Sequence, residues 1–401
     1  MESIALAYAG VHQIFQLALA AHEMGELDFL CASIFDSPGK LGAHIARHLH
    51  SPSAHPLDSE KLPSERVREY PWPFLTHRVV AKLLSQRNSD HHFTNDWFDR
   101  HAASFIRQSK AKLFVGAETC ALHSMRAAKE RGMKCVLDCP GIPMNFLDRE
   151  ASNAAKNWGM KVTPSSNSTA MVDRKMQELE LADVILACSE FQKSVLVANG
   201  VSAERIRVIP LWVNAGFWRD VNKDKSFSAK PLRVVYAGAV SLRKGVPFLL
   251  EAVRLLGDAV TLTLIGPAAL EMEPLLRKFP AIQRFPYVPK ERLREIYAKQ
   301  DVLVMPTLGD SFGFVALEAM AAGLPAIASS HCGAPLPDES WRVQAASPEA
   351  IAARLQHYIG QPAQLTEDGA IGAAFAAHYT PERYRETARG IFKEMLASPR
   401  A

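Results

Sequence analysis

Short apolar runs alternate with amphipathic helical segments along most of this 401-residue chain, and this alternation restricts the fold more than any other feature. In the first half the expected strands are Ile4–Ala7, Phe29–Ile34, Leu113–Gly116, Cys135–Asp138, Val184–Ala187 and Ile206–Ile209, and the expected helices include Val11–Met24, Leu122–Arg131 and Glu190–Ala198. Repeated strand–helix units of this kind predict parallel sheets that are covered by helices on both faces.

The same pattern returns in the second half after a polar, charged segment, Asp220–Lys230, in which we place an interdomain linker. Expected strands there are Arg233–Ala237, Thr261–Ile265, Val302–Met305 and Ala326–Ala328, and expected helices are Pro247–Leu256, Glu271–Phe279, Lys290–Lys299 and Phe314–Ala322. A chain of this length suits two domains of about 150–200 residues. We therefore expect an α/β fold with two Rossmann-like domains, residues 1–219 and 220–380, whose strand ends face a cleft.

Residues 38–108 interrupt the pattern, because they are polar and rich in histidine. Helical stretches at Leu75–Leu84 and Trp97–Ile106 suggest an insertion that carries helices rather than sheet strands. A second polar tract, Thr163–Thr169, is typical of a loop.

The final segment, Pro381–Ala397, has the period of an amphipathic helix. Its apolar stripe consists of Tyr384, Ala388, Ile391, Phe392 and Met395. We expect residues 381–401 to cross back and pack on the first domain; in the simpler alternative, the helix completes the second domain.

Composition argues against several classes of protein. There is no apolar run of about 20 residues that would span a membrane, and the apolar stretch near the N-terminus lacks the basic start of a signal peptide. The net charge of +4 comes from mixed charges, which argues against a nucleic-acid partner. The six cysteines have no CxxC spacing, so we expect reduced thiols and a cytoplasmic location. Peripheral contact with a membrane is compatible with this composition.

Metal binding is not expected. Eight of the fourteen histidines fall between His44 and His101, but no three of them have convincing ligand spacing. No DxD motif occurs, so a metal-bridged diphosphate is not implied either. We therefore expect no cofactor.

The segment Thr307–Gly323 (TLGDSFGFVALEAMAAG) carries the strongest chemical signal. A loop with Asp310 and Gly313 leads into an apolar helix, and Glu318 lies in the middle of that helix, where a carboxylate is costly without donors. The start of the helix could bind a phosphate, while the two carboxylates could accept hydroxyl groups. In the alternative, Glu318 pairs with a buried cation and Asp310 only caps the helix; the pattern favours neither.

A second segment, Gly238–Pro247 (GAVSLRKGVP), places two cations at the start of a helix. Arg243 and Lys244 oppose the helix dipole there, which makes sense if an anion such as a departing nucleoside diphosphate lies beside them. The segment is not a Walker loop, since GxxxxGK[ST] is absent. A solvated basic turn is the alternative.

Together these segments resemble the signature of glycosyltransferase family 4. The resemblance rests on an acidic residue, seven others and then Glu, followed by AMAAGLP, and it covers nearly the whole chain. It includes Leu181–Asn214, Tyr236–Ala252 and Phe285–Gly313 in the family's order. Members of the family are GT-B enzymes that transfer a sugar from a nucleotide donor with retention of configuration. The implied partners are a nucleotide sugar and a glycan or lipid-linked acceptor, in cell-surface polysaccharide synthesis.

The resemblance also implies roles for individual residues. Glu318 would hold the ribose hydroxyls and Asp310 the sugar hydroxyls, while Arg243 and Lys244 would face the diphosphate. Further donor contacts are implied at Gly238, Gly266, Val288, Ser311, Phe312, Gly313, Phe314 and the Gly333–Pro335 turn. Cleft candidates in the first domain are Gly10, His12, Glu118 and Asp138, each of which could equally serve only a turn. The base would be read by backbone near Phe285–Val288.

Two departures from the family keep other readings open. Asp310 replaces the commoner Glu, and Ala239 stands where many relatives have Arg. A GT-B-like protein that binds a nucleotide sugar or glycan without turnover is one alternative, and an inverting enzyme is another. An interaction scaffold built on the histidine-rich segment would lack matched cations and carboxylates in the cleft.

Overall fold

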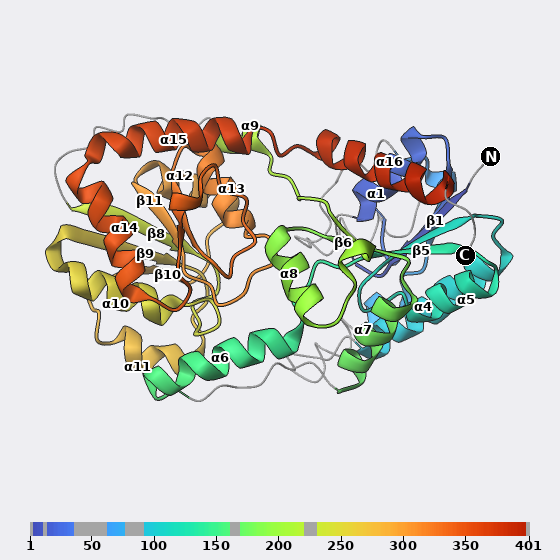
Figure 1. Cartoon of the computed structure of the whole chain (residues 1–401), viewed down its shortest axis with the longest axis horizontal. Coiled ribbons are helices and arrows are strands. Elements are labelled where there is room, and N and C mark those ends of the chain that lie inside the picture. Colours follow the sequence, from blue (N-terminus) through green and yellow to red (C-terminus); the bar gives the residue numbers. More distant parts are fainter. Residues whose placement is uncertain are drawn as a thin grey trace.

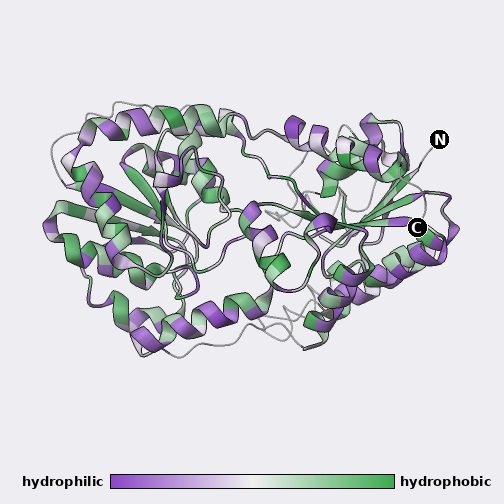
Figure 2. Cartoon of the chain, in the orientation of Figure 1, coloured by the Kyte–Doolittle hydropathy of each residue, from purple (hydrophilic) through white to green (hydrophobic). Residues whose placement is uncertain are grey.

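The computed structural model describes residues 3–10, 14–35, 62–76, 92–160, 169–219 and 231–397. Their strands form a seven-stranded sheet of order β3-β2-β1-β4-β5-β6-β7 and a six-stranded sheet of order β10-β9-β8-β11-β12-β13. All strand pairs are parallel. Figure 1 shows the two sheets side by side, each flanked by helices, and Figure 2 shows apolar strands beneath helices with polar outer faces. The predicted pair of Rossmann-like domains is confirmed.

The strands of the first sheet are β1 (Ile4–Tyr8), β2 (Leu27–Ala32), β3 (Val67–Glu69), β4 (Leu113–Ala117), β5 (Lys134–Asp138), β6 (Val184–Ala187) and β7 (Ile206–Val208). The helices of this half are α1 (Ile14–Glu23), α4 (His92–Gln108), α5 (Leu122–Glu130), α6 (Met144–Trp158), α7 (Thr169–Leu181), α8 (Glu190–Ala198) and α9 (Ala215–Arg219). Short 3-10 segments lie at Ser64–Arg66 and Ala203–Arg205.

The strands of the second sheet are β8 (Leu232–Ala237), β9 (Val260–Ile265), β10 (Gln283–Phe285), β11 (Val302–Met305), β12 (Ala326–Ser329) and β13 (Arg342–Val343). The helices that follow are α10 (Val246–Leu256), α11 (Glu273–Leu276), α12 (Lys290–Ala298), α13 (Phe314–Ala321), α14 (Pro348–Gly360), α15 (Pro362–Ala376) and α16 (Pro381–Ala397). Short 3-10 segments lie at Gly257–Ala259, Leu270–Met272 and Glu339–Trp341.

The prediction that the 38–108 insertion contains no sheet strand is wrong. Val67–Glu69 forms the edge strand β3, which pairs with β2 through Leu30 and Val67. The strand buries one apolar residue and carries two charged ones, so it is too short for a period-two pattern. Arg68 covers its apolar neighbour by placing its guanidinium 3.9 Å from the centre of the Phe29 ring. The predicted helix at Trp97–Ile106 is confirmed within α4.

The predicted helix Glu271–Phe279 is also wrong in detail. A 3-10 segment, Leu270–Met272, comes first, and the four-residue helix α11 then begins with a proline in its first turn. Proline fits a first turn but not a helix interior, and this explains why the helix restarts at that point. Several other expectations lie outside the described residues: the linker, most of the 163–169 tract, and the part of Leu75–Leu84 beyond residue 76.

Each sheet has a point at which strand order reverses. In the first sheet this point lies between β1 and β4, and in the second between β8 and β11. Loops that leave the carboxyl ends of the two strands turn away from each other at such a point and leave a crevice that binds ligands. The two segments that the sequence singled out, after β8 and after β11, therefore meet at the reversal point of the second sheet.

The last helix, α16, packs on α1 of the first half, whereas α15 lies over the second half (Figure 1). Tyr384 and Phe392, from the predicted apolar stripe, are buried. Arg385 donates to Gln16 at 2.7 Å and forms an ion pair with Glu23 at 2.8 Å. The C-terminal segment thus ties the two halves together.

Helix α6 also connects the two halves. It belongs to the first half in sequence, starts beside the first sheet and ends against the second (Figure 1). Ala154 and Ala155 belong to the apolar cluster of the second sheet, and the Trp158 ring lies 5.8 Å from that of Phe248 on α10. The α6 helix ends at Gly159, whose φ of 59° suits the left-handed end of a helix.

A glycine pair tests how tightly the loops at the carboxyl ends of β8 and β11 are packed. Gly245 has φ of 71°, and a Cβ there would lie 1.8 Å from the carbonyl oxygen of Pro306. Gly257 has φ of 55° but has nothing within 4 Å of such a Cβ. We expect Gly245→Ala to lower the thermal midpoint much more than Gly257→Ala, which has only the backbone cost of about 1–3 kcal/mol. Equal midpoints of the two variants in differential scanning calorimetry would show that the contact between Gly245 and Pro306 does not contribute to stability.

Candidate functional site

The loops after β8 and β11 are joined by backbone contacts before any side chain is considered. The amide of Leu308 donates to the carbonyl of Arg243 at 3.0 Å, and Gly245 packs directly against Pro306. This approach brings the ammonium of Lys244 to 2.6 Å from Oδ2 of Asp310. The cation and the carboxylate that the sequence assigned to separate segments thus form one ion pair.

Asp310 also organises the start of α13. Its Oδ1 accepts the amides of Gly313 at 2.9 Å and Phe312 at 3.2 Å. Burial by itself would raise the pKa of Asp310, but Lys244 and these two amides outweigh it and hold the pKa below its usual value. Asp310 is therefore ionised at neutral pH and fixed at both oxygens.

The first turn of α13 is suited to an anion. Gly313 takes the left-handed conformation at the N-cap, with φ of 67°, and no side chain caps the helix. A Cβ on Gly313 would lie 2.8 Å from the sulfur of Cys332, so only glycine fits there. Phe314, the first helical residue, is half-exposed. Uncapped amides at a helix start attract phosphate groups.

Glu318 lies in the interior of α13 with few compensating contacts. Its nearest cation is Lys290, at 3.9 Å, and the Lys290 side chain is 63% exposed. Burial raises the pKa of Glu318 to about 7, and Lys290 only partly opposes this. The alternative in which Glu318 pairs with a buried cation is therefore not what the structure shows. A carboxylate left in this state is available to accept hydrogen bonds from a ligand.

The remaining predicted donor contacts lie around the same loops. The Arg243 side chain is exposed, and its backbone carbonyl accepts the amide of Leu308. Gly238 and Gly266 cross closely, because a Cβ on Gly266 would lie 2.0 Å from the carbonyl oxygen of Gly238. Val288 belongs to the loop between β10 and α12 and packs against the edge of the core. Gly333 contacts Ser311, as described below.

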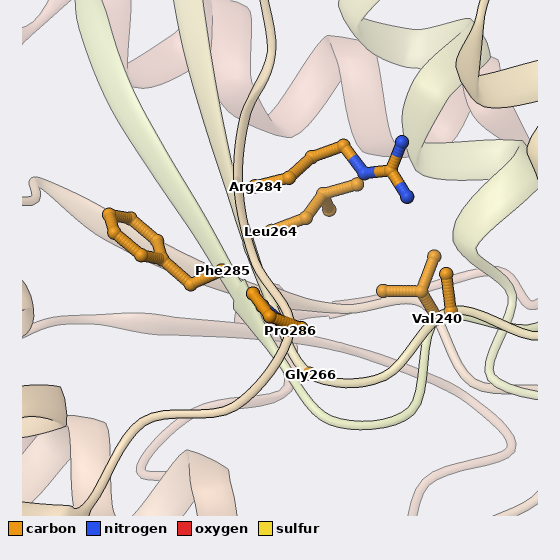
Figure 3. A pocket seen from close by; sticks show the side chains of 7 residues that line it. Val240, Leu264, Gly266, Arg284, Phe285 and Pro286 are labelled. Atoms are coloured by element: carbon orange, nitrogen blue, oxygen red, sulfur yellow. The ribbon is translucent and has the colours of Figure 1, made fainter.

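A cavity of about 310 Å³ opens at the ends of β8, β9 and β10 (Figure 3). It is lined by Val240, Leu264, Gly266, Ala268, Arg284, Phe285 and Pro286. In Figure 3 the Phe285 ring points away from Leu264 and Arg284. Leu264 belongs to the apolar cluster on the α10 side, whereas α13 packs on the other face of the sheet. The cavity therefore borders the predicted base region but lies on the opposite face from Glu318.

Candidates in the first half gather at the carboxyl ends of β1, β4 and β5. Glu118 pairs with Lys175 of α7 at 3.0 Å, and its carboxylate lies against Gly141, where a Cβ would lie 2.6 Å from Oε2. Asp138 is buried, and its carbonyl accepts the amide of Glu118 at 2.9 Å. Gly10 follows β1 and packs on Tyr8, whose pKa is raised well above its usual value by burial and then by nearby anionic groups.

His12 lies outside the described residues. Within the described part of the chain, no three His, Cys, Asp or Glu side chains are arranged to hold a metal ion. Among those same residues, no helix combines the length and the apolar character needed to cross a bilayer.

The sequence reasoning missed three residues that the structure brings to the site. Lys175 and Lys290 approach Glu118 and Glu318 from helices α7 and α12, and no local pattern marked them. Ser189 caps α8 by accepting the amide of Gln192 at 3.0 Å, and its hydroxyl also reaches the second half. A serine before an amphipathic helix does predict a cap, but not that second contact.

Comparison with known proteins gives a consistent result. Residues 231–361 match the family model described as "Glycosyl transferases group 1". D-inositol 3-phosphate glycosyltransferase from Streptomyces avermitilis is 30% identical over 250 residues, 55% of this chain and 54% of that protein. The amylovoran biosynthesis glycosyltransferase AmsK from Erwinia amylovora is 29% identical over 169 residues, 38% of this chain and 40% of that protein. The chain thus spans about half the length of these relatives.

Solved structures match over nearly the full length at low identity. Sucrose-phosphate synthase from Thermosynechococcus elongatus superposes with a TM-score of 0.66, 17% identity and 100% coverage of both chains. HepE from Anabaena in complex with UDP gives 0.64 at 14% identity, covering 98% of this chain and 100% of that one. In fold the whole chain is of the GT-B type, and in sequence its second half is similar to the group 1 glycosyltransferases.

Proposed function

We propose that this protein is a nucleotide-sugar-dependent glycosyltransferase whose donor site is the crevice between β8 and β11. The observation that carries the proposal is the Lys244–Asp310 pair, which lies beside the uncapped start of α13. The undercompensated Glu318 lies about one turn further along the same helix. A nucleotide sugar offers the matching groups: a diphosphate for the cation and the amides, and hydroxyls for the carboxylates. The match of residues 231–361 to a glycosyltransferase model supports this assignment.

Within that activity we propose the chemistry of family 4, a retaining transfer. Glu318 would accept hydrogen bonds from the ribose, and Asp310 from the transferred sugar. Lys244, with Arg243 at the mouth, would stabilise the charge that develops on the leaving diphosphate, which is the main work in a reaction of this type. The acceptor would lie against Glu118, Lys175 and Asp138. A glycan or a lipid-linked sugar of a surface polysaccharide is the acceptor class that we propose.

Thermal stabilisation by a panel of nucleotide sugars tests the proposal. UDP-, GDP- and ADP-sugars should be compared with the free sugars. At least one nucleotide sugar should raise the melting temperature of the protein in a concentration-dependent way. At the same concentration, the same ligand should stabilise a Glu318→Ala variant much less. If no member of the panel stabilises the wild-type protein, the donor-site assignment is wrong.

A rival function is nucleotide-sugar binding without turnover, which Ala239 in place of the common Arg keeps open. Release of the nucleoside diphosphate separates the two. A glycosyltransferase should release it from the stabilising donor, slowly to water and faster with an acceptor. Binding without release over many hours, with purified glycans and lipid-linked sugars present, would favour the rival.

A further inference from the structure

One hydrogen bond crosses from the first half of the molecule to the donor loop. The hydroxyl of Ser189, in the turn between β6 and α8, donates to the carbonyl oxygen of Ser311 at 2.6 Å. Ser189 is almost fully buried, with 7% of its surface exposed. Cys188 adds a weaker contact from its thiol to the same oxygen at 3.3 Å. The bond is therefore protected from water.

The bond acts on one end of a peptide unit whose other end touches Asp310. The carbonyl of Ser311 and the amide of Phe312 belong to the same planar group, so fixing one direction fixes the other. That amide donates to Oδ1 of Asp310 at 3.2 Å, while Oδ2 holds Lys244. A hydroxyl from the acceptor half thus orients the carboxylate of the donor half through a single peptide plane.

The surroundings leave no freedom in this contact. A Cβ on Gly333 would lie 2.1 Å from the Ser311 oxygen and 2.3 Å from the Ser189 hydroxyl. Gly309, in the same donor loop, packs so closely on α6 that a Cβ would lie 2.3 Å from a methyl of Leu147. Two glycines therefore allow the donor loop to contact the first half directly.

The turn that contains Ser189 is also hydrogen-bonded, through Gln192, to the loop after β5. Gln192 is fully buried, and its amide nitrogen donates to the carbonyl oxygens of Cys139 and Gly141. Its amide oxygen accepts the backbone amide of Cys188 at 2.8 Å. Because Gly141 lies against Glu118, one buried network runs from the acceptor side of the cleft to Asp310.

From this geometry we infer that Ser189 is a positioning residue for transfer: from the first half, it orients Asp310 and Lys244 of the second half. The inference rests on the proposed function. It separates two properties of the donor site. Nucleotide binding depends on Glu318, the α13 amides and the charge of Lys244, all of which belong to the second half. Turnover depends in addition on the orientation of the Asp310–Lys244 pair, which the first half completes.

Ser189→Ala should lower kcat about tenfold, the effect of losing one well-formed hydrogen bond. Nucleoside diphosphate affinity and the donor KM should change less than about twofold, measured with UDP, GDP or ADP, whichever stabilises the wild-type protein. Ser189→Thr retains the hydroxyl and should recover most of the rate. Ser194→Ala is the matched control, because Ser194 lies on the same helix, is exposed and donates only to its own helix at Phe191.

Ser189 also caps α8, so Ser189→Ala removes the helix cap as well as the hydrogen bond to Ser311. Gly333→Ala tests the contact with the serine retained, since a Cβ there forces the Ser189 hydroxyl and the Ser311 carbonyl apart. It should lower kcat like Ser189→Ala, and the double variant should be no slower than the slower single variant, because both changes remove the same bond. Wild-type kcat in both single variants, or a change in donor KM with kcat unaltered, overturns the inference.

Hydrogen exchange tests the positioning independently of catalysis. In Ser189→Ala the amides of Phe312 and Gly313 should exchange at least severalfold faster than in the wild-type protein, while those of α10 stay unchanged. If the wild-type protein neither binds a nucleotide nor turns over, the proposed function has failed, and unchanged exchange at these amides would overturn the inference as well. Faster exchange in an inactive protein would still support Ser189 as the residue that orders the donor loop.

Discussion

Replacing Glu318 by alanine should weaken nucleotide binding by about 30- to 1000-fold, equivalent to about 2–4 kcal/mol for the loss of charge-assisted hydrogen bonds. The fold should survive, because alanine suits the apolar helix α13 and removes a poorly compensated carboxylate. Isothermal titration with the nucleoside diphosphate of the stabilising donor measures the loss. An unchanged affinity would mean that the ribose does not lie at Glu318.

Glu318→Gln tests the same assignment through the pH dependence of stability and of nucleotide affinity. Burial raises the pKa of Glu318 to about 7 from an unfolded value near 4.5, so the protonated form favours folding and that contribution is lost as pH rises through 7. Glutamine cannot ionise, so the variant should lose less stability than the wild-type protein between pH 6 and 8. Nucleotide affinity should rise more steeply over the same range in the wild-type protein than in the variant. Glu178, whose pKa burial also raises to about 7, is present in both proteins and cancels in the comparison.

Lys244→Met should reduce turnover by about 100- to 1000-fold, the usual cost of removing one preorganised group that stabilises transition-state charge. Methionine retains the aliphatic stem, so the melting temperature should stay within a few degrees. The pKa of Asp310 should rise, because its nearest cation is gone. The measurement is steady-state release of the nucleoside diphosphate, with nucleotide affinity determined in parallel.

Arg243→Met is the matched neighbour of this variant. Arg243 is exposed and is one residue away, so it should depress turnover less than Lys244→Met does. The double variant should have almost no transfer activity. Wild-type turnover in the double variant would place the phosphate site elsewhere on the molecule.

Much of the fold follows from local pattern. The strands β8, β9 and β11 and the helices α10 and α13 are near-continuous apolar runs or clear amphipathic periods, so the sequence predicts them to within a residue or two. Other elements were not predicted. β3 has only three residues, and α7 buries only four of its thirteen, so neither shows a clear apolar period. α6 does show one, because its buried residues Phe146, Leu147, Ala151, Ala154 and Ala155 lie on one face, and the prediction missed it.

The sequence by itself determined which residue types the donor site contains. Asp310, Gly313 and Glu318 have a fixed spacing along one loop and one helix, and Lys244 lies at the start of another helix, so their neighbourhood follows from two strand ends and a reversal of strand order. The tertiary structure decided how they are paired. Three contacts depend on segments that are distant in the sequence. Lys290 and Glu318 are 28 residues apart, Lys244 and Asp310 are 66 apart, and Ser189 and Ser311 are 122 apart. Such contacts arise from close packing of loops that glycines permit, and local periodicity carries no information about them.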